Sequence, residues 1–309
     1  MTESVHVRAP GKINLALRVG APDSTGYHPL ATVFQAVDLY EDVTATRTGA
    51  SDGELTLSVV GRGAAAVPTD ATNLAVRAAE LLRETTGATA GAQLEIVKRV
   101  PVGGGMGGGS ADAAAALLAC DQLWGLGLDR AELVALGGQL GADVPFALTG
   151  LTAVGTGRGD VVTSAMSSGT YHWVLATQAR GTATPTVFAE FDELGGRTAA
   201  PPELDDDLLA ALRAGDPLQL ARHLANDLEE AALELRPELA DVLAATDRAG
   251  ALAAVVSGSG PTVAALCIDA SHAQSVASVL RAAQVADDVL TVTAPTHGAR
   301  VLEHVQRED

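Results

Sequence analysis

The stretch that decides the fold is the glycine run Pro101-Val102-Gly103-Gly104-Gly105-Met106-Gly107-Gly108-Gly109-Ser110. It follows an alternating apolar stretch over 93–100, which predicts a strand, and precedes an alanine- and leucine-rich stretch over 110–123, which predicts a helix. Glycine lets the backbone come close to an anion, and the first turn of a helix offers unpaired N–H groups. A strand, a glycine run and a helix in this order therefore predict a phosphate-binding loop.

Other glycine-rich loops fit this context less well. The P-loop of nucleotide triphosphatases requires a Gly-Lys-Ser/Thr ending, and the run contains no lysine. Gly103, Gly105 and Gly108 do match the dinucleotide pattern G-x-G-x-x-G, but that fold needs a strand ending in an acid after the helix. Here a second helix is expected instead, over 129–140. A flexible linker would mix serine with glycine. A nicotinamide-dependent oxidoreductase and a linker remain as weaker alternatives.

The helix after the glycine run is expected to begin at Ser110. Serine is a favoured N-cap residue, because its hydroxyl accepts a hydrogen bond from an unpaired N–H group of the first turn. Asp112 then falls in that first turn, where a negative charge interacts favourably with the helix dipole.

Length and charge limit the class of protein. A chain of 309 residues with 47% hydrophobic and 19% charged residues predicts a globular protein of two domains. Its formal net charge of -18 argues against nucleic acid or an anionic membrane as a partner. Cys120 and Cys267 lie in apolar stretches and are expected to be small buried residues in a reducing compartment. No signal peptide or membrane span is expected, so the predicted location is the cytoplasm.

The remaining pattern is a mixture of strands and helices, which predicts the α+β class. Alternating apolar residues predict strands over 5–19, interrupted at Pro10-Gly11, and over 30–42, 55–61, 173–177, 252–256 and 262–268. Helical spacing predicts helices over 73–86, in several pieces over 203–248, and over 271–284. A strand over 288–293 is expected to close the chain. The change of pattern places the domain boundary near 150–165.

Three stretches in this order resemble the three motifs of the galactokinase, homoserine kinase, mevalonate kinase and phosphomevalonate kinase superfamily. They are Ala9–Leu15 (APGKINL), Pro101–Ala113 and Ser257–Val263 (SGSGPTV). The resemblance implies a two-domain small-molecule kinase that uses ATP and Mg²⁺. It also implies an ATP-binding amino-terminal domain over 1–163, similar to domain 2 of ribosomal protein S5, and a ferredoxin-like carboxy-terminal domain over 164–309. An RNA-binding relative of that ribosomal domain would need a basic surface, which the net charge argues against.

Four further stretches narrow the resemblance. Gly26–Leu30, Asn73–Ala79, Gly141–Phe146 and Thr184–Phe188 are similar to those of the superfamily members that phosphorylate 4-diphosphocytidyl-2-C-methyl-D-erythritol. The similarity implies transfer of the γ-phosphate of ATP to the C2 hydroxyl of the methylerythritol unit, in the methylerythritol phosphate route to isoprenoid precursors. A homoserine or mevalonate kinase is the nearest alternative, although those enzymes have no reason to place Tyr-His after the first motif.

Lys12 and Asp143 are the candidate catalytic pair. A carboxylate can accept the hydroxyl proton, and a lysine beside it can keep it ionised and orient the hydroxyl. Asp143 would otherwise be an N-cap ahead of Pro145 at the first helical position, and Lys12 a solvated strand residue.

Asn14, Tyr27, His28 and Phe188 are the candidate substrate-binding residues. Asn14 is expected to share a strand face with Lys12, two residues away. The resemblance implies that Tyr27 and Phe188 stack on a cytosine ring and that His28 pairs with its edge. The alternatives are loop packing for Tyr27 and helix-core packing for Phe188.

The candidate nucleotide-binding residues surround the glycine run. They are Asn73, Lys98, Pro101, Gly103, Gly104, Gly105, Met106, Gly107, Gly108, Gly109 and Ser110. Asn73 is also expected to cap the helix that follows it. Asp112 stands where the family more often has asparagine, so it could help to hold Mg²⁺ or serve the helix N-terminus, and we favour the second role. The sequence does not identify the metal ligands. It also does not decide between a monomer and a homodimer.

Overall fold

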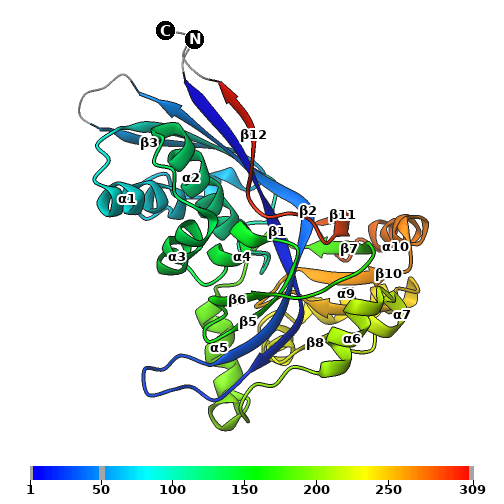
Figure 1. Cartoon of the computed structure of the whole chain (residues 1–309). Helices are drawn as coiled ribbons and strands as arrows, with labels where there is room; N and C mark the ends of the chain where they lie inside the picture. Colours follow the sequence, from blue (N-terminus) through cyan, green and yellow to red (C-terminus); the bar gives the residue numbers. More distant parts are fainter. Residues whose placement is uncertain (1–2, 49–52, 306–309) are drawn as a thin grey trace.

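The computed structural model describes residues 3–48 and 53–305 and contains two β-sheets with helices packed on both (Figure 1). The larger sheet has eight strands. In spatial order they are β12 (Arg300–Val305), β1 (Ser4–Val19), β2 (Leu30–Arg47), β4 (Ala92–Lys98) and β3 (Leu55–Gly61), with β5 (Thr152–Thr156) and β6 (Val161–Ser164) beside β2, and β8 (Ala225–Asn226) beside β1. The smaller sheet has the order β11 (Asp288–Ala294), β7 (Tyr171–Thr177), β10 (Val263–Cys267) and β9 (Ala253–Val256). The α+β prediction is confirmed.

Helices of the first half cover the larger sheet. They are α1 (Leu74–Thr86), α2 (Gly108–Trp124), α3 (Arg130–Leu140) and the short α4 (Val144–Thr149). Helix α2 is buried almost all round: alanines on it pack against Val7 and Val43 of the sheet and against Leu82 of α1. Small side chains let it approach the sheet closely, which fixes the position of its N-terminus relative to β1. Because α3 and not a strand follows α2, the dinucleotide-binding alternative fails on topology.

The smaller sheet has a hydrophobic core on each face. Val174 and Ala176 of β7 face the core formed with helices of the second half. The helices on this face are α5 (Thr184–Glu193), α8 (Glu229–Leu235), α9 (Glu238–Arg248) and α10 (Ala270–Ala283), while α6 (Asp206–Ala214) and α7 (Pro217–Leu220) pack into the core on the opposite face. Trp173 and Leu175 point the other way, into a core shared with Ile13 of β1 and with α6. The alternation along β7 therefore joins the two halves through a common core.

Strand β1 runs without interruption through the position where a break was predicted. The pairing of β1 with β2 shifts its register between Pro10 and Lys12. It shifts a second time between Asn14 and Ala16. Such irregularities bend a strand and redirect its side chains. Lys12 and Asn14 lie together as predicted, since Nζ of Lys12 donates to Oδ1 of Asn14 over 2.7 Å.

The prediction that the strand over 288–293 is the last element of the chain was wrong. The strand predicted over 288–293 is β11, but β12 follows it and pairs with β1 at the edge of the larger sheet. The red strand β12 therefore lies beside the dark blue β1 in Figure 1. Cys120 and Cys267 are buried free cysteines, as predicted. Among the described residues, no helix is both long and apolar enough to cross a membrane.

Candidate active site

A cavity of ≈ 1250 Å³ lies between the two halves of the chain and is lined by all three kinase-like motifs. Every predicted site residue lines it: Lys12, Asn14, Tyr27, His28, Asn73, Lys98, Pro101, the run 103–110, Asp143 and Phe188. The sequence stretches are thus brought to one place, although they are spread over more than half of the chain.

The glycine run forms a tight loop that ends in helix α2. Gly103, Gly105 and Gly107 have positive φ angles of 66°, 74° and 69°, which glycine adopts without strain. Helix α2 begins at Gly108, with Gly107 as N-cap and no side-chain cap hydrogen bond. The N–H groups of its first turn are therefore left for an anion, and the potential there is positive.

The prediction that Ser110 caps α2 was wrong. Gly108 and Gly109 are helical, so Ser110 is the third residue of the helix. A Cβ atom on Gly108 would lie 3.2 Å from Oε1 of Glu41 and 3.2 Å from Cγ1 of Val100. A side chain at this position would require Glu41 or Val100 to move slightly, so the close packing at the helix start favours glycine.

Gly105 is the position in the loop where a side chain has least room. A Cβ atom there would lie 2.1 Å from the carbonyl oxygen of Ser257 and 2.9 Å from the amide nitrogen of Gly260. We expect Gly105→Ala to lower the free energy of unfolding by about 2–3 kcal/mol, because it combines this clash with a positive φ. Gly109→Ala is the matched control, since its Cβ would meet only Cδ1 of Leu74 at 3.8 Å. Urea unfolding of both variants measures this difference. Equal free energies of unfolding for Gly105→Ala and Gly109→Ala would contradict the prediction.

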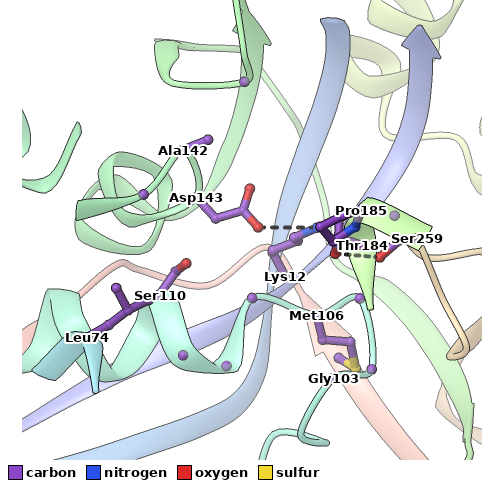
Figure 2. Close-up of a pocket in the computed structure, with 18 of the residues that line it drawn as sticks. Lys12, Leu74, Gly103, Met106, Ser110, Ala142, Asp143, Thr184, Pro185 and Ser259 are labelled. Atoms are coloured by element: carbon purple, nitrogen blue, oxygen red, sulfur yellow. Dashed lines mark hydrogen bonds and ion pairs between the residues drawn. The ribbon is translucent and has the colours of Figure 1, made fainter. Parts of the chain in front are cut away.

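Lys12 and Asp143 face each other across the cavity, as the dashed line in Figure 2 marks. Nζ of Lys12 lies 3.6 Å from Oδ2 of Asp143. Asp143 does occupy the N-cap position of α4, with Pro145 as the second helical residue. Its side chain makes no cap hydrogen bond, however, so the carboxylate is turned toward Lys12 instead.

The three motifs meet at Lys12. Its backbone N–H donates to the carbonyl oxygen of Met106 over 3.0 Å, which joins β1 to the glycine loop. A Cβ atom on Gly107 would lie 3.3 Å from Cγ of Lys12 and 3.5 Å from Oδ2 of Asp143. A Cβ atom on Gly258 would lie 3.2 Å from Nζ of Lys12. The ammonium group therefore lies beside both glycine loops and beside the carboxylate.

A buried charge cluster of Glu41, Lys98 and Asp112 lies behind the glycine loop. Nζ of Lys98 is 2.8 Å from Oε1 of Glu41 and 2.6 Å from Oδ2 of Asp112. The carboxylate of Glu41 also accepts the backbone N–H groups of Arg99 and Val100. Glu41 therefore ties strand β2 to the end of β4, directly before the loop begins.

Burial acts on the pKa of all three side chains in this cluster. It raises the pKa of Glu41 to about 7, against the attraction of Lys98. Burial also raises the pKa of Asp112 above its ordinary value. Burial lowers the pKa of the Lys98 ammonium. Attraction by Asp112 and Glu41 outweighs this effect, so the pKa of Lys98 is raised. Two acids thus compete for one cation in a site with little water.

The prediction that Asp112 serves the N-terminus of helix α2 was wrong. The first turn of α2 contains no acidic residue, because the helix begins before Ser110 and Asp112 lies beyond that turn. Its Oδ2 is paired with Lys98, and its buried Oδ1 has no hydrogen-bond partner among the described residues.

Asn73 lines the cavity at the start of helix α1, and its proposed contact with the nucleotide stays a prediction. Oδ1 of Asn73 accepts the N–H group of Ala75 over 2.8 Å, which confirms the N-cap of α1. Its amide donates to the carbonyl oxygen of Pro68 over 2.7 Å. Lys98 lines the cavity, while its ammonium group is held by the two buried acids.

The other end of the cavity lies between the loop after β1 and helix α5. The rings of His28 and Phe188 are 5.2 Å apart between centroids. Nδ1 of His28 lies 2.8 Å from the carbonyl oxygen of Gly20, and Nε2 lies 3.5 Å from Oδ1 of Asp192. Tyr27 does not pack on Phe188; the guanidinium of Arg158 lies 3.6 Å above the Tyr27 ring. The roles of these side chains in base recognition stay predictions.

Several side chains at the site were not singled out from the sequence. Arg158 and Asp192 are single polar residues in a turn and a helix, with no local pattern that marks them. Glu41 lies within a correctly predicted strand, and only its burial reveals it. Thr184 and Ser259 belong to stretches that resembled the family. Their hydroxyl groups are 3.0 Å apart, and the dashed line between them in Figure 2 marks this hydrogen bond. In the described part of the chain, no three His, Cys, Asp or Glu side chains gather to hold a metal ion.

Comparison with known proteins agrees with this geometry. Residues 73–151 match the family described as GHMP kinases N terminal domain, and residues 208–286 match GHMP kinases C terminal. A crystal structure of 4-(cytidine 5'-diphospho)-2C-methyl-D-erythritol kinase has a TM-score of 0.77 and 31% identity, over 94% of this chain and 99% of that chain. Homoserine kinase from Cytophaga hutchinsonii shares the fold, with a TM-score of 0.71 and 21% identity over 97% of each chain. The fold and site thus define an ATP-dependent small-molecule kinase with the two-domain architecture of the GHMP kinases.

Curated relatives narrow this class. A 4-diphosphocytidyl-2-C-methyl-D-erythritol kinase of Leifsonia xyli subsp. xyli is 52% identical over 97% of this chain and 99% of the relative. That of Streptomyces coelicolor is 52% identical over 97% of this chain and its whole length. The chain therefore belongs to the 4-diphosphocytidyl-2-C-methyl-D-erythritol kinase family.

Proposed function

We propose that this protein transfers the γ-phosphate of ATP to the C2 hydroxyl of 4-diphosphocytidyl-2-C-methyl-D-erythritol, giving the 2-phosphate and ADP. The observation that supports this most directly is the Lys12–Asp143 pair, which touches the phosphate loop on one side and opens toward the Tyr27–His28 loop on the other. The full-length similarity to kinases of that name supports the same substrate.

In the proposed reaction the helix start and the glycine loop hold the phosphates. The N–H groups of the first turn of α2 bind phosphate oxygens, and the positive potential there stabilises the charge that develops on them. Asp143 accepts the proton of the attacking hydroxyl. Lys12, held by Asn14 and 3.6 Å from the carboxylate of Asp143, binds the hydroxyl oxygen or the transferred group. The chain thus contributes mainly position and charge.

A divalent cation fits the same end of the cavity. Asp112 and Ser110 both line the cavity, and Oδ1 of Asp112 is buried and without a hydrogen-bond partner among the described residues. Carboxylate and hydroxyl oxygens suit Mg²⁺, which in nucleotide sites takes most of its other ligands from phosphates and water. Asp112 and Ser110 are therefore the residues that would hold the ion, and its chemistry would be to neutralise phosphate charge.

The buried free cysteines suit a reducing compartment, so the cytoplasm stays our expectation for the location of the protein.

A substrate panel tests the proposed function. We expect the purified protein to release ADP from ATP with the cytidyl substrate, and to release none above background with homoserine or mevalonate. The shared fold with homoserine kinase makes that comparison the decisive one. Comparable ADP release with homoserine or mevalonate would show that the loop after β1 does not select a cytidyl substrate.

A further inference from the structure

The hairpin between β5 and β6 places one arginine at the edge of the cavity. Arg158 lies between Gly157 and Gly159, whose φ angles are 70° and 91°, so the turn depends on backbone that glycine adopts readily. The carbonyl oxygen of Gly157 accepts the N–H group of Leu30 over 2.7 Å. The turn is thus anchored at the start of β2, directly after the loop that contains Tyr27 and His28.

This turn also touches the catalytic side of the cavity. A Cβ atom on Gly159 would lie 3.7 Å from Cδ1 of Leu30 and 4.0 Å from Cβ of Ala142, the residue before Asp143. The Arg158 turn therefore lies between the candidate cytosine site and the candidate acceptor site, in contact with the chain on both sides.

The exposed guanidinium of Arg158 contacts two side chains of the loop after β1. It lies 3.6 Å above the ring of Tyr27, and its Nη2 is 3.4 Å from Oγ1 of Thr25. Stacking on an aromatic face uses the plane of the guanidinium and leaves the N–H groups at its edge available. Tyr27 therefore supports the arginine in a position where it can donate to an anion.

Among the described residues, Arg158 has no acid at ion-pair distance, although its attraction adds to the hydrogen bonds from Thr25 that lower the pKa of the nearby Asp23 carboxyl. Within residues 3–48 and 53–305, no carboxylate oxygen lies within the 4.0 Å ion-pair distance of its guanidinium. Asp160 accepts only its backbone N–H group, and Asp23 accepts hydrogen bonds from Thr25 and Tyr27. By contrast, the cavity's lysines already have partners, Lys98 in the buried cluster and Lys12 beside Asp143.

We propose that Arg158 binds the diphosphate of the cytidyl substrate. The inference rests on the proposed function, because the diphosphate joins the cytidine to the methylerythritol unit that carries the acceptor hydroxyl. If the cytosine base lies beside His28 and Phe188, and the acceptor hydroxyl lies beside Asp143, the diphosphate between them runs along the Arg158 turn. Arginine can donate two parallel hydrogen bonds to phosphate oxygens. In a chain of net charge -18 it also supplies attraction that the bulk of the surface does not.

The test compares the binding of cytidine diphosphate and cytidine by isothermal titration calorimetry. We expect Arg158→Gln to weaken cytidine diphosphate binding by about 10–100-fold, the size of a lost charged hydrogen-bond pair. Cytidine binding should change much less, and Arg158→Lys should recover part of the diphosphate affinity. Arg222→Gln, an exposed arginine outside the cavity, controls for the change in net charge.

The outcomes separate this inference from the proposed function. If Arg158→Gln weakens cytidine and cytidine diphosphate equally, the arginine only supports Tyr27 and the inference is wrong. If diphosphate affinity is unchanged while the wild-type protein still releases ADP with the cytidyl substrate, the inference is wrong and the proposed function stands. Failure of the wild-type protein in that ADP assay would overturn both.

Discussion

Replacing Asp143 with asparagine is expected to lower turnover by about 10²–10⁴-fold, the usual contribution of a positioned general base. Asparagine has the same shape, so the start of α4 and the cavity wall should be preserved. The side chain makes no cap hydrogen bond, so its loss does not remove a structural contact of the helix. What changes is the acceptor for the hydroxyl proton, 3.6 Å from Nζ of Lys12.

Steady-state kinetics with ATP and the cytidyl substrate would measure this effect. The KM for ATP should stay close to the wild-type value, because the phosphate loop is untouched. Lys12→Met and the double variant complete the comparison: if the two side chains act as a unit, the double variant is hardly slower than the slower single one. Wild-type turnover in Asp143→Asn would remove this residue from the role of base.

Local structure could be predicted where the signal lies within one segment. Strand β3 was predicted over 55–61 and is found there, and Asn73 caps α1 as its position before an apolar helix indicated. In each case the residues that decide the structure lie within a few positions of one another, so periodicity and capping chemistry suffice.

Contacts between distant segments could not be predicted in this way. Glu41 accepts the N–H group of Arg99, 58 residues away, and Arg158 approaches Thr25 across 133 residues. No local pattern encodes such pairs. The early start of α2 has the same origin, since Gly108 is helical where it packs against Glu41 and Val100. The candidate catalytic pair was singled out only because whole motifs resembled a family; from the residues alone, an N-cap was the favoured interpretation of Asp143.

The buried cluster of Glu41, Lys98 and Asp112 carries the largest expected effect on stability. Lys98→Met is expected to lower the free energy of unfolding by about 3–5 kcal/mol, the cost of leaving buried carboxylates without their cation. The Lys98 side chain is 2% exposed and both acids are equally buried, so water cannot replace the ammonium. Glu41→Gln in the Lys98→Met background should recover part of the loss, because it removes one of the two uncompensated charges.

The pH dependence of stability provides the more specific measurement. In the folded wild-type protein the pKa of Glu41 is about 7, against an ordinary 4.5. The folded state therefore binds the proton more tightly than the unfolded state, so this residue's contribution to stability is complete below pH 4.5 and is lost as the pH rises through about 7. Glu41→Gln should flatten the profile across that window, and Lys98→Met should be more destabilising at about pH 8 than at about pH 5.5, where protonation neutralises a carboxylate. Urea unfolding at the two pH values measures both effects. Equal destabilisation by Lys98→Met at both would mean that the cluster does not share a titrating proton, and that Lys98 holds the base of the phosphate loop by packing alone.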